Sequence, residues 1–182
     1  SLLSAGAIDS IRAIWWDVRP HPEFGTVELR MCDGPSTLGE VGAVAALAQC
    51  LVTRIATAID EGEPLPSPPR WILRENKWLA ARYGLDAAIV VNQKGERKVL
   101  REALPALLAD LAPTAAKLGC TEELASVARI VEHGASYERQ RRMVADGATL
   151  YDVVHALVGE LETNSPDGVV AAPGRTGATS AG

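Results

Sequence analysis

Four charged side chains near the start of the chain are the residues best suited to chemistry. They are Asp17 and Arg19 on one short segment, and Glu28 and Arg30 on the next. A carboxylate can hold Mg²⁺ through its oxygen atoms. Arginine side chains can hold phosphate oxygens and neutralise the charge that develops during phosphoryl transfer. From the residues alone two interpretations stay open, and one of them is a site for ATP and Mg²⁺. The alternative is a solvated strand face whose ion pairs stabilise little.

The elements that must position these residues are two strands. Residues 14–19 and 26–32 each alternate between apolar and polar side chains, which is typical of half-buried strands. Residues 20–25 between them contain two prolines and a glycine, which mark a turn. The pattern predicts an antiparallel hairpin.

The hairpin would place the charged side chains on one face. If Arg19 pairs with Thr26, then Asp17 lies opposite Glu28, and Arg30 follows on the same side. The opposite face would carry apolar side chains that pack on a helix: Ile14, Trp16, Val18, Val27, Leu29 and Met31. Rigid strands suit a site that needs fixed geometry.

Helical patterns predict much of the chain that follows. Thr37 with Glu40 predicts a capping box at the start of a long helix that ends near Glu61. A second helix is expected from about Arg70 to Arg82, followed by a small hairpin of residues 87–91 and 97–100.

The rest of the chain to about Thr163 is predicted to be helical in segments, with Pro113 breaking or kinking the first of them. Thr121, Ser136 and Thr149 are expected to start later segments. The arginines at 139, 141 and 142 read as a solvated helix face.

These elements predict an α+β fold over residues 1–163. Residues 164–182, rich in Pro, Gly, Ala, Ser and Thr, are predicted to be a disordered tail.

Composition narrows the function classes. The net charge of −5 argues against a nucleic-acid-binding protein, which would carry a basic patch. We expect no membrane partner, because no apolar stretch is judged to reach the roughly 18 residues of a span. Cys32, Cys50 and Cys120 are far apart and suit a reducing cytoplasm, where we expect the protein. The chain lacks an initiator Met and begins in a helical pattern, which suggests a fragment.

Two longer motifs carry a family resemblance. Residues 15–33, WWDVRPHPEFGTVELRMCD, resemble the bacterial carboxylate–amine ligases of the glutamate–cysteine ligase family. Residues 74–78, RENKW, and 81–85, ARYGL, are similar to a second signature of that family. Weaker similarity continues, so that the resemblance covers about residues 10–163.

The resemblance implies the catalytic fold of glutamine synthetase, a curved antiparallel sheet with helices behind it. It also implies that Glu28 ligates Mg²⁺ and that Arg30 contacts ATP phosphates or the acyl-phosphate intermediate. Arg19 resembles a second phosphate-side arginine. The other metal-binding carboxylates of the family lie in an N-terminal half that these residues do not include.

The second signature contributes Asn76 and Arg82 as substrate-binding candidates. Arg82 could reach an acidic substrate carboxylate. Alternatively, it forms an ordinary surface pair with Trp78 one helical turn away.

The resemblance implies an ATP-dependent ligase that activates the γ-carboxylate of glutamate as an acyl phosphate and joins it to an amine such as cysteine. We expect this chain to be the C-terminal part, to need the N-terminal half as partner, and to form a homo-oligomer. One alternative is a non-catalytic assembly module. Another is a ligase that uses a different amine.

Overall fold

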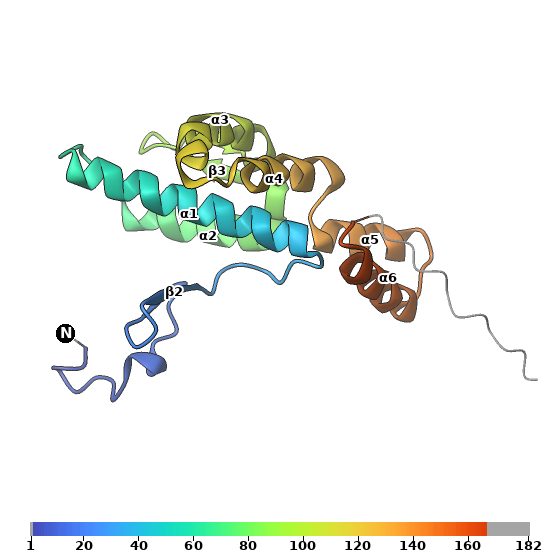
Figure 1. Cartoon of the computed structure of the whole chain (residues 1–182), viewed down its shortest axis with the longest axis horizontal. Coiled ribbons are helices and arrows are strands. Elements are labelled where there is room, and N and C mark those ends of the chain that lie inside the picture. Colours follow the sequence, from blue (N-terminus) through green and yellow to red (C-terminus); the bar gives the residue numbers. More distant parts are fainter. Residues whose placement is uncertain (1, 167–182) are drawn as a thin grey trace, which may run out of the picture. The chain divides into compact units, whose positions relative to one another are not determined.

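The chain folds as two compact units. The computed structural model describes residues 2–166; the first unit ends at Gly34 and the second begins at Pro35 (Figure 1). The part of the predicted tail from residue 167 onward lies outside the described residues.

The first unit contains the predicted hairpin. A short 3-10 helix, Ile11–Ala13, precedes β1 (Val18–His21), which pairs antiparallel with β2 (Thr26–Leu29). The strands are joined at residues 22–25, where Gly25 has a φ of 60°. Glycine reaches this left-handed region without the steric cost that a Cβ would impose.

The predicted register of the hairpin is wrong by two residues. Arg19 pairs with Glu28, and Thr26 pairs with His21, because β1 continues through Pro20 and His21 instead of ending before them. Proline is tolerated where its missing N–H breaks no central ladder, as in a two-stranded ribbon. Side chains alternate with a period of two, so a shift of two residues leaves every side chain on its predicted face.

The second unit is mainly helical, with one small sheet. The sheet and the mixed composition agree with the predicted α+β class, and the second hairpin is present as predicted. The elements are α1 (Leu38–Asp60), α2 (Arg70–Tyr83), a 3-10 helix (Gly84–Asp86), β3 (Ala88–Val90), β4 (Arg97–Val99), α3 (Leu100–Leu118), α4 (Thr121–His133), α5 (Ser136–Ala145) and α6 (Leu150–Thr163).

Local capping signals located some helix starts correctly and missed others. Thr37 caps α1, since its Oγ1 accepts a hydrogen bond from the Glu40 N–H at 3.1 Å. Thr149 and Asp152 form a complete capping box at α6, as predicted. Thr121 is instead the first residue of α4, and Cys120 occupies the cap position.

Helix α3 runs through Pro113 without a break, so the prediction of a break there is wrong. A proline removes one backbone hydrogen bond and crowds the preceding turn. The neighbouring side chains Leu111 and Ala115 are completely buried. Their burial stabilises the helix on both sides of the proline.

The core of the second unit lies where α1, α3 and α4 meet. Small side chains on α1 let the helices approach closely, and the sulfur atoms of Cys50 and Cys120 lie 3.8 Å apart. The two cysteines are therefore packing residues. The buried cluster consists of Ala46, Cys50, Leu111, Ala115 and Leu124.

A buried ion cluster joins α5 and α6 to the start of α1. Arg139 is only 8% exposed; its Nη1 lies 2.8 Å from Glu40 Oε1 and its Nη2 lies 3.0 Å from Glu160 Oε2. Ser36 donates a hydrogen bond to Glu160 as well. The prediction of a solvated arginine face is therefore wrong for Arg139, because α5 turns this side chain toward two carboxylates from other helices.

We expect Arg139→Ala to lower the free energy of unfolding by about 3–5 kcal/mol, because it leaves two buried carboxylates without their partner. Arg141→Ala is the matched control on the same helix. The Arg141 side chain is exposed, 5.3 Å from the Tyr137 ring, so its loss should cost less than about 1 kcal/mol. Urea unfolding followed by circular dichroism measures both. Equal losses in the two variants would contradict a structural role for the buried cluster.

Candidate functional site

The hairpin brings three of the predicted site residues together. Glu28 Oε2 lies 2.5 Å from Arg19 Nη2, and Glu28 Oε1 lies 3.2 Å from Arg30 Nη1. Their shared face follows from the pairing of Arg19 with Glu28 and from the period of two along β2. The prediction that these three side chains lie on one face is therefore confirmed. The Glu28 side chain is 44% exposed, so solvent screens both ion pairs.

Neighbouring groups fix the positions of the two arginines. The guanidinium carbon of Arg30 lies 4.6 Å from the centre of a Trp15 ring, a favourable cation–π distance. The Arg30 N–H donates to the carbonyl of Asp17 at 2.7 Å, which extends the strand ladder by one bond. Arg19 donates to the carbonyl of Arg12 at 3.3 Å. Two cations are thus held beside one acid.

A cavity of about 260 Å³ lies against the turn end of the hairpin, within the first unit, and Arg12, Arg19 and His21 line it together with Asp9 and Glu23. Arg19 Nε and His21 Nδ1 are buried and lack a hydrogen-bond partner among the described residues. Buried polar atoms are almost always paired in native proteins.

The described residues do not form a complete magnesium site. They include no group of three or more His, Cys, Asp or Glu side chains that could hold a metal ion. Mg²⁺ takes six oxygen ligands, and Glu28 alone offers one carboxylate that is already paired with two arginines. Further ligands would have to come from outside these residues.

Asn76 holds α2 against β3. Its Nδ2 donates to the Val90 carbonyl at 2.9 Å, and its Oδ1 accepts from the Val90 N–H at 2.7 Å. The side-chain amide therefore satisfies both backbone groups of Val90, its N–H and its carbonyl. This double contact gives Asn76 a structural function.

Arg82 lies apart from Asn76. Its guanidinium carbon is 5.8 Å from the Tyr83 ring, and its side chain is exposed. Trp78 packs edge-on against the same tyrosine, with 5.9 Å between ring centres. The structure therefore gathers Trp78 and Arg82 around Tyr83, and both substrate candidates belong to the second unit.

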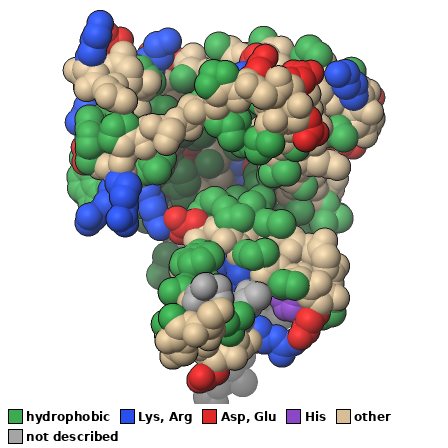
Figure 2. Space-filling model, turned by 90° about the vertical axis from the view of Figure 1, so that its left-hand side faces the viewer, with side chains coloured by type: hydrophobic (Ala, Val, Ile, Leu, Met, Phe, Trp, Pro, Cys, Tyr) green, Lys and Arg blue, Asp and Glu red, His purple; other side chains and the backbone are tan. Residues whose placement is uncertain are grey.

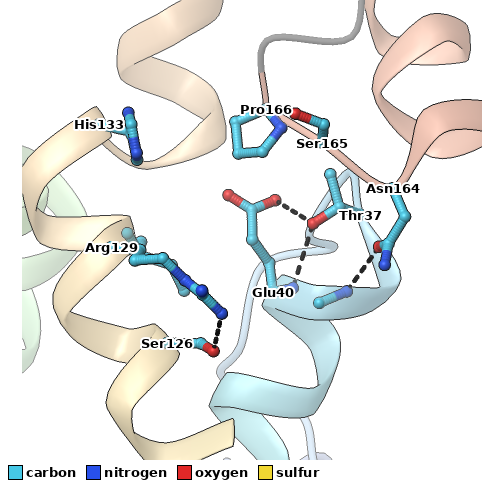
Figure 3. Close-up of a pocket in the computed structure, with 10 residues that line it drawn as sticks. Thr37, Glu40, Ser126, Arg129, His133, Asn164, Ser165 and Pro166 are labelled. Carbon is cyan, nitrogen blue, oxygen red and sulfur yellow. Dashed lines mark hydrogen bonds between the residues drawn. The ribbon is translucent and has the colours of Figure 1, made fainter. Parts of the chain in front are cut away.

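A second cavity, of about 340 Å³, lies between the start of α1, the end of α4 and the end of α6 (Figure 3). Arg129 donates to the Ser126 hydroxyl on its wall, and the Gly39 N–H donates to Asn164 Oδ1 at 2.8 Å. Glu40 reaches into the cavity region between Thr37 and His133. Most lining residues are polar, and hydrogen bonds join several of them to one another.

Glu40 is an ionised structural group at this cavity. Burial alone would raise its pKa, but hydrogen bonds and the positive charge of Arg139 outweigh burial, so the pKa of Glu40 lies below its ordinary value. For Arg139, burial alone would lower the pKa, but contacts with Glu160 and Glu40 raise it. Glu40 therefore stays ionised at neutral pH and is poorly suited to accept a proton.

Sequence reasoning missed this cluster, although one signal was present. Glu40 and Glu160 stand in helices that are otherwise mostly apolar along their inward faces. A buried acid requires a cationic partner. The partner's identity could not be read locally, because Arg139 is 99 residues from Glu40.

Most of the chain is similar to known proteins. The model of a family described as glutamate–cysteine ligase family 2 matches residues 1–156. A Frankia alni protein provisionally named glutamate–cysteine ligase 2-1 is 55% identical over 168 residues, and a Thermobifida fusca protein provisionally named glutamate–cysteine ligase 2 is 52% identical over 176 residues. These alignments cover 91% and 97% of this chain. The chain spans less than half of each relative's length, 44% in both cases.

The lowered pKa of Glu40 predicts a loss of stability in acid. Because the folded state binds the Glu40 proton less tightly than the unfolded state, the stabilisation is present above the ordinary pKa of 4.5 and is lost as pH falls through the folded pKa. We expect the free energy of unfolding to fall as pH decreases through the interval below about 4.5. Glu40→Gln should be less stable at neutral pH and should lose less over this interval.

Urea unfolding at several pH values measures this dependence, and Glu63→Gln, at an exposed position, is the control that should keep the slope of the unaltered chain. A Glu40→Gln variant with the same slope as the control would contradict the assignment.

Proposed function

Because the chain belongs to glutamate–cysteine ligase family 2, we propose that it supplies part of an ATP-dependent ligase that joins glutamate to an amine such as cysteine. The observation that carries the proposal is the cluster of Arg19, Glu28 and Arg30 on one strand face. The part of the relatives' length that this chain does not cover would supply the N-terminal half of the enzyme. In the complete enzyme, β1 and β2 would join a larger antiparallel sheet of the glutamine-synthetase type.

The proposed reaction has two steps. A γ-carboxylate oxygen of glutamate attacks the terminal phosphorus of ATP, which gives γ-glutamyl phosphate and ADP. The amine nitrogen then attacks the acyl carbon, the bond to the phosphate oxygen breaks, and the nitrogen loses a proton as the amide forms. Both steps develop negative charge on phosphate oxygens, which preorganised cations can stabilise.

Arg30 suits this role because its environment holds it in place. The Trp15 ring and the Glu28 carboxylate restrict its guanidinium before any substrate binds. A cation that is already positioned costs little reorganisation during reaction. Arg19, which pairs with Glu28 and lines the cavity at the turn end of the hairpin, adds a second cation.

Glu28 would contribute one oxygen ligand to Mg²⁺, and the N-terminal half would supply the others. Bound Mg²⁺ would neutralise phosphate charge. Arg82, which is exposed, is the proposed contact for a glutamate carboxylate. Asn76 would act through its support of α2 on β3, which keeps Arg82 on a fixed helix. We place the enzyme in the cytoplasm, where ATP is available.

In the assembled enzyme, we expect Arg30→Lys to lower the rate of phosphate release about 10²- to 10³-fold, because an ammonium cannot reproduce the two-pronged contact of a guanidinium. Phosphate release from ATP in the presence of glutamate and cysteine is the measurement. Arg97→Lys, which changes an exposed arginine paired with Glu75, is the control and should keep the normal rate. Normal turnover in Arg30→Lys would remove Arg30 from the mechanism.

Glu28→Gln should respond to magnesium. A neutral amide is a weaker ligand than a carboxylate, so we expect a higher Mg²⁺ requirement and partial rescue at raised Mg²⁺. The measurement is the same assay over a Mg²⁺ series. Glu63→Gln, at an exposed acid in the second unit, should leave the Mg²⁺ dependence unchanged. A Glu28→Gln defect that ignores Mg²⁺ would leave Glu28 as an orienting partner for the arginines only.

A further inference from the structure

Helix α1 is apolar on two opposite faces. One face is buried against α3 and α4 through Ala43, Ala46 and Cys50. The opposite face is largely open to solvent within the described residues; Val52 is 63% exposed and Ile59 is 58% exposed. We call this face the open stripe, and it consists of Val41, Ala45, Ala48, Val52, Ile55 and Ile59.

The open stripe is continuous. Its members are spaced alternately four and three residues apart, so at 3.6 residues per turn they stay within roughly a quarter of the helix circumference. At 1.5 Å per residue the stripe is about 27 Å long. It contains no charged residue. Exposed hydrophobic side chains, shown in green, also cover much of the face seen in Figure 2.

The charged residues of α1 lie off the stripe, and two of them pair with residues of other helices. Glu40 is bound by Arg139, and Arg54 pairs with Asp110 of α3. A helix that is apolar around most of its circumference belongs to a protein interior. A contiguous apolar surface of this length on a soluble protein marks an interaction site.

We propose that the open stripe is the docking surface for the part of the ligase that this chain lacks. This inference rests on the proposed function, since it assumes that the chain assembles into the longer enzyme. The matched relatives carry more than half of their length outside the region that this chain covers. Covered on both faces, α1 becomes the middle layer of the complete protein.

A membrane is the less favoured occupant. By length and composition alone, α1 could cross a membrane, which corrects the expectation from the sequence that no stretch is apolar enough. However, its other face carries the Glu40 and Arg54 ion pairs, and such charges are costly within a bilayer. A second copy of this chain could also pack its own stripe against this one, since both have the same alternating spacing. The extra length of the relatives would then not be needed to cover the stripe.

The test uses the tagged chain co-expressed with the portion of the Thermobifida fusca relative that lies outside the match. We expect the two polypeptides to purify together. Ile55→Lys and, separately, Val52→Lys should reduce the captured partner at least about tenfold, because each places a charge in a desolvated contact. Thr57→Lys adds the same charge to the same helix off the stripe, and should capture the partner normally.

A fold control and two further measurements separate the occupants. Since Ile55 and Val52 are exposed, both variants should keep the circular dichroism spectrum and unfolding transition of the unaltered chain. Capture that is absent in the unaltered chain, or unaffected by both stripe variants, overturns the proposal. Sedimentation as a dimer that Ile55→Lys dissociates would assign the stripe to a second copy. Flotation with anionic liposomes that Ile55→Lys abolishes would assign it to a membrane.

The outcome also distinguishes this inference from the proposed ligase. A co-purified pair that depends on the stripe but releases no phosphate from ATP would uphold the docking surface and reject the activity. A pair that turns over glutamate and ATP while tolerating both lysine substitutions would uphold the ligase activity and reject the docking surface.

Discussion

The second unit depends on one buried guanidinium. Arg139 binds carboxylates from α1 and α6 while its own helix, α5, lies between these elements in the sequence. Burying an arginine and two glutamates is costly unless each charge is paired, and removing one member leaves the others exposed to that cost. Helices α1, α5 and α6 must therefore pack together for these three charges to be paired. The cluster also keeps Glu40 ionised, with its negative charge balanced by Arg139. The part of the neighbouring cavity that Glu40 lines is therefore structural.

The proposed site follows a different rule. Arg19, Glu28 and Arg30 meet through pairing between adjacent strands, in an exposed setting where each ion pair adds little stability. Their value lies in position: two cations stand on a rigid ribbon, and one is stacked on Trp15. Stability and proposed chemistry are thus carried by separate charge clusters in separate units of the chain.

The difference between local and distant contacts explains what the sequence could predict. Alternation placed the three hairpin residues on one face, and this survived an incorrect register because the error was two residues, one full side-chain period. Thr149 and Asp152 predicted the start of α6 correctly, because a capping box forms between residues that are close in the sequence. By contrast, the partner of Glu40 is 99 residues away, and the backbone partner of Asn76 is on a strand beyond the following turn. Pro113 does not break α3, because helix packing, not local propensity, decides whether the helix continues; the alternative of a kink stays a prediction.

The two neighbouring sulfurs in the core have a consequence if the proposed ligase uses cysteine as its amine. Burial raises the pKa of the Cys50 thiol, and Cys50 is completely buried. The thiolate is the form that attacks disulfides, so a protonated, inaccessible thiol exchanges slowly. If cysteine is the amine, oxidised cystine will accompany it in the cell. Cys50 would then react slowly with the disulfide form of that substrate, although the sulfur of Cys120 lies 3.8 Å away.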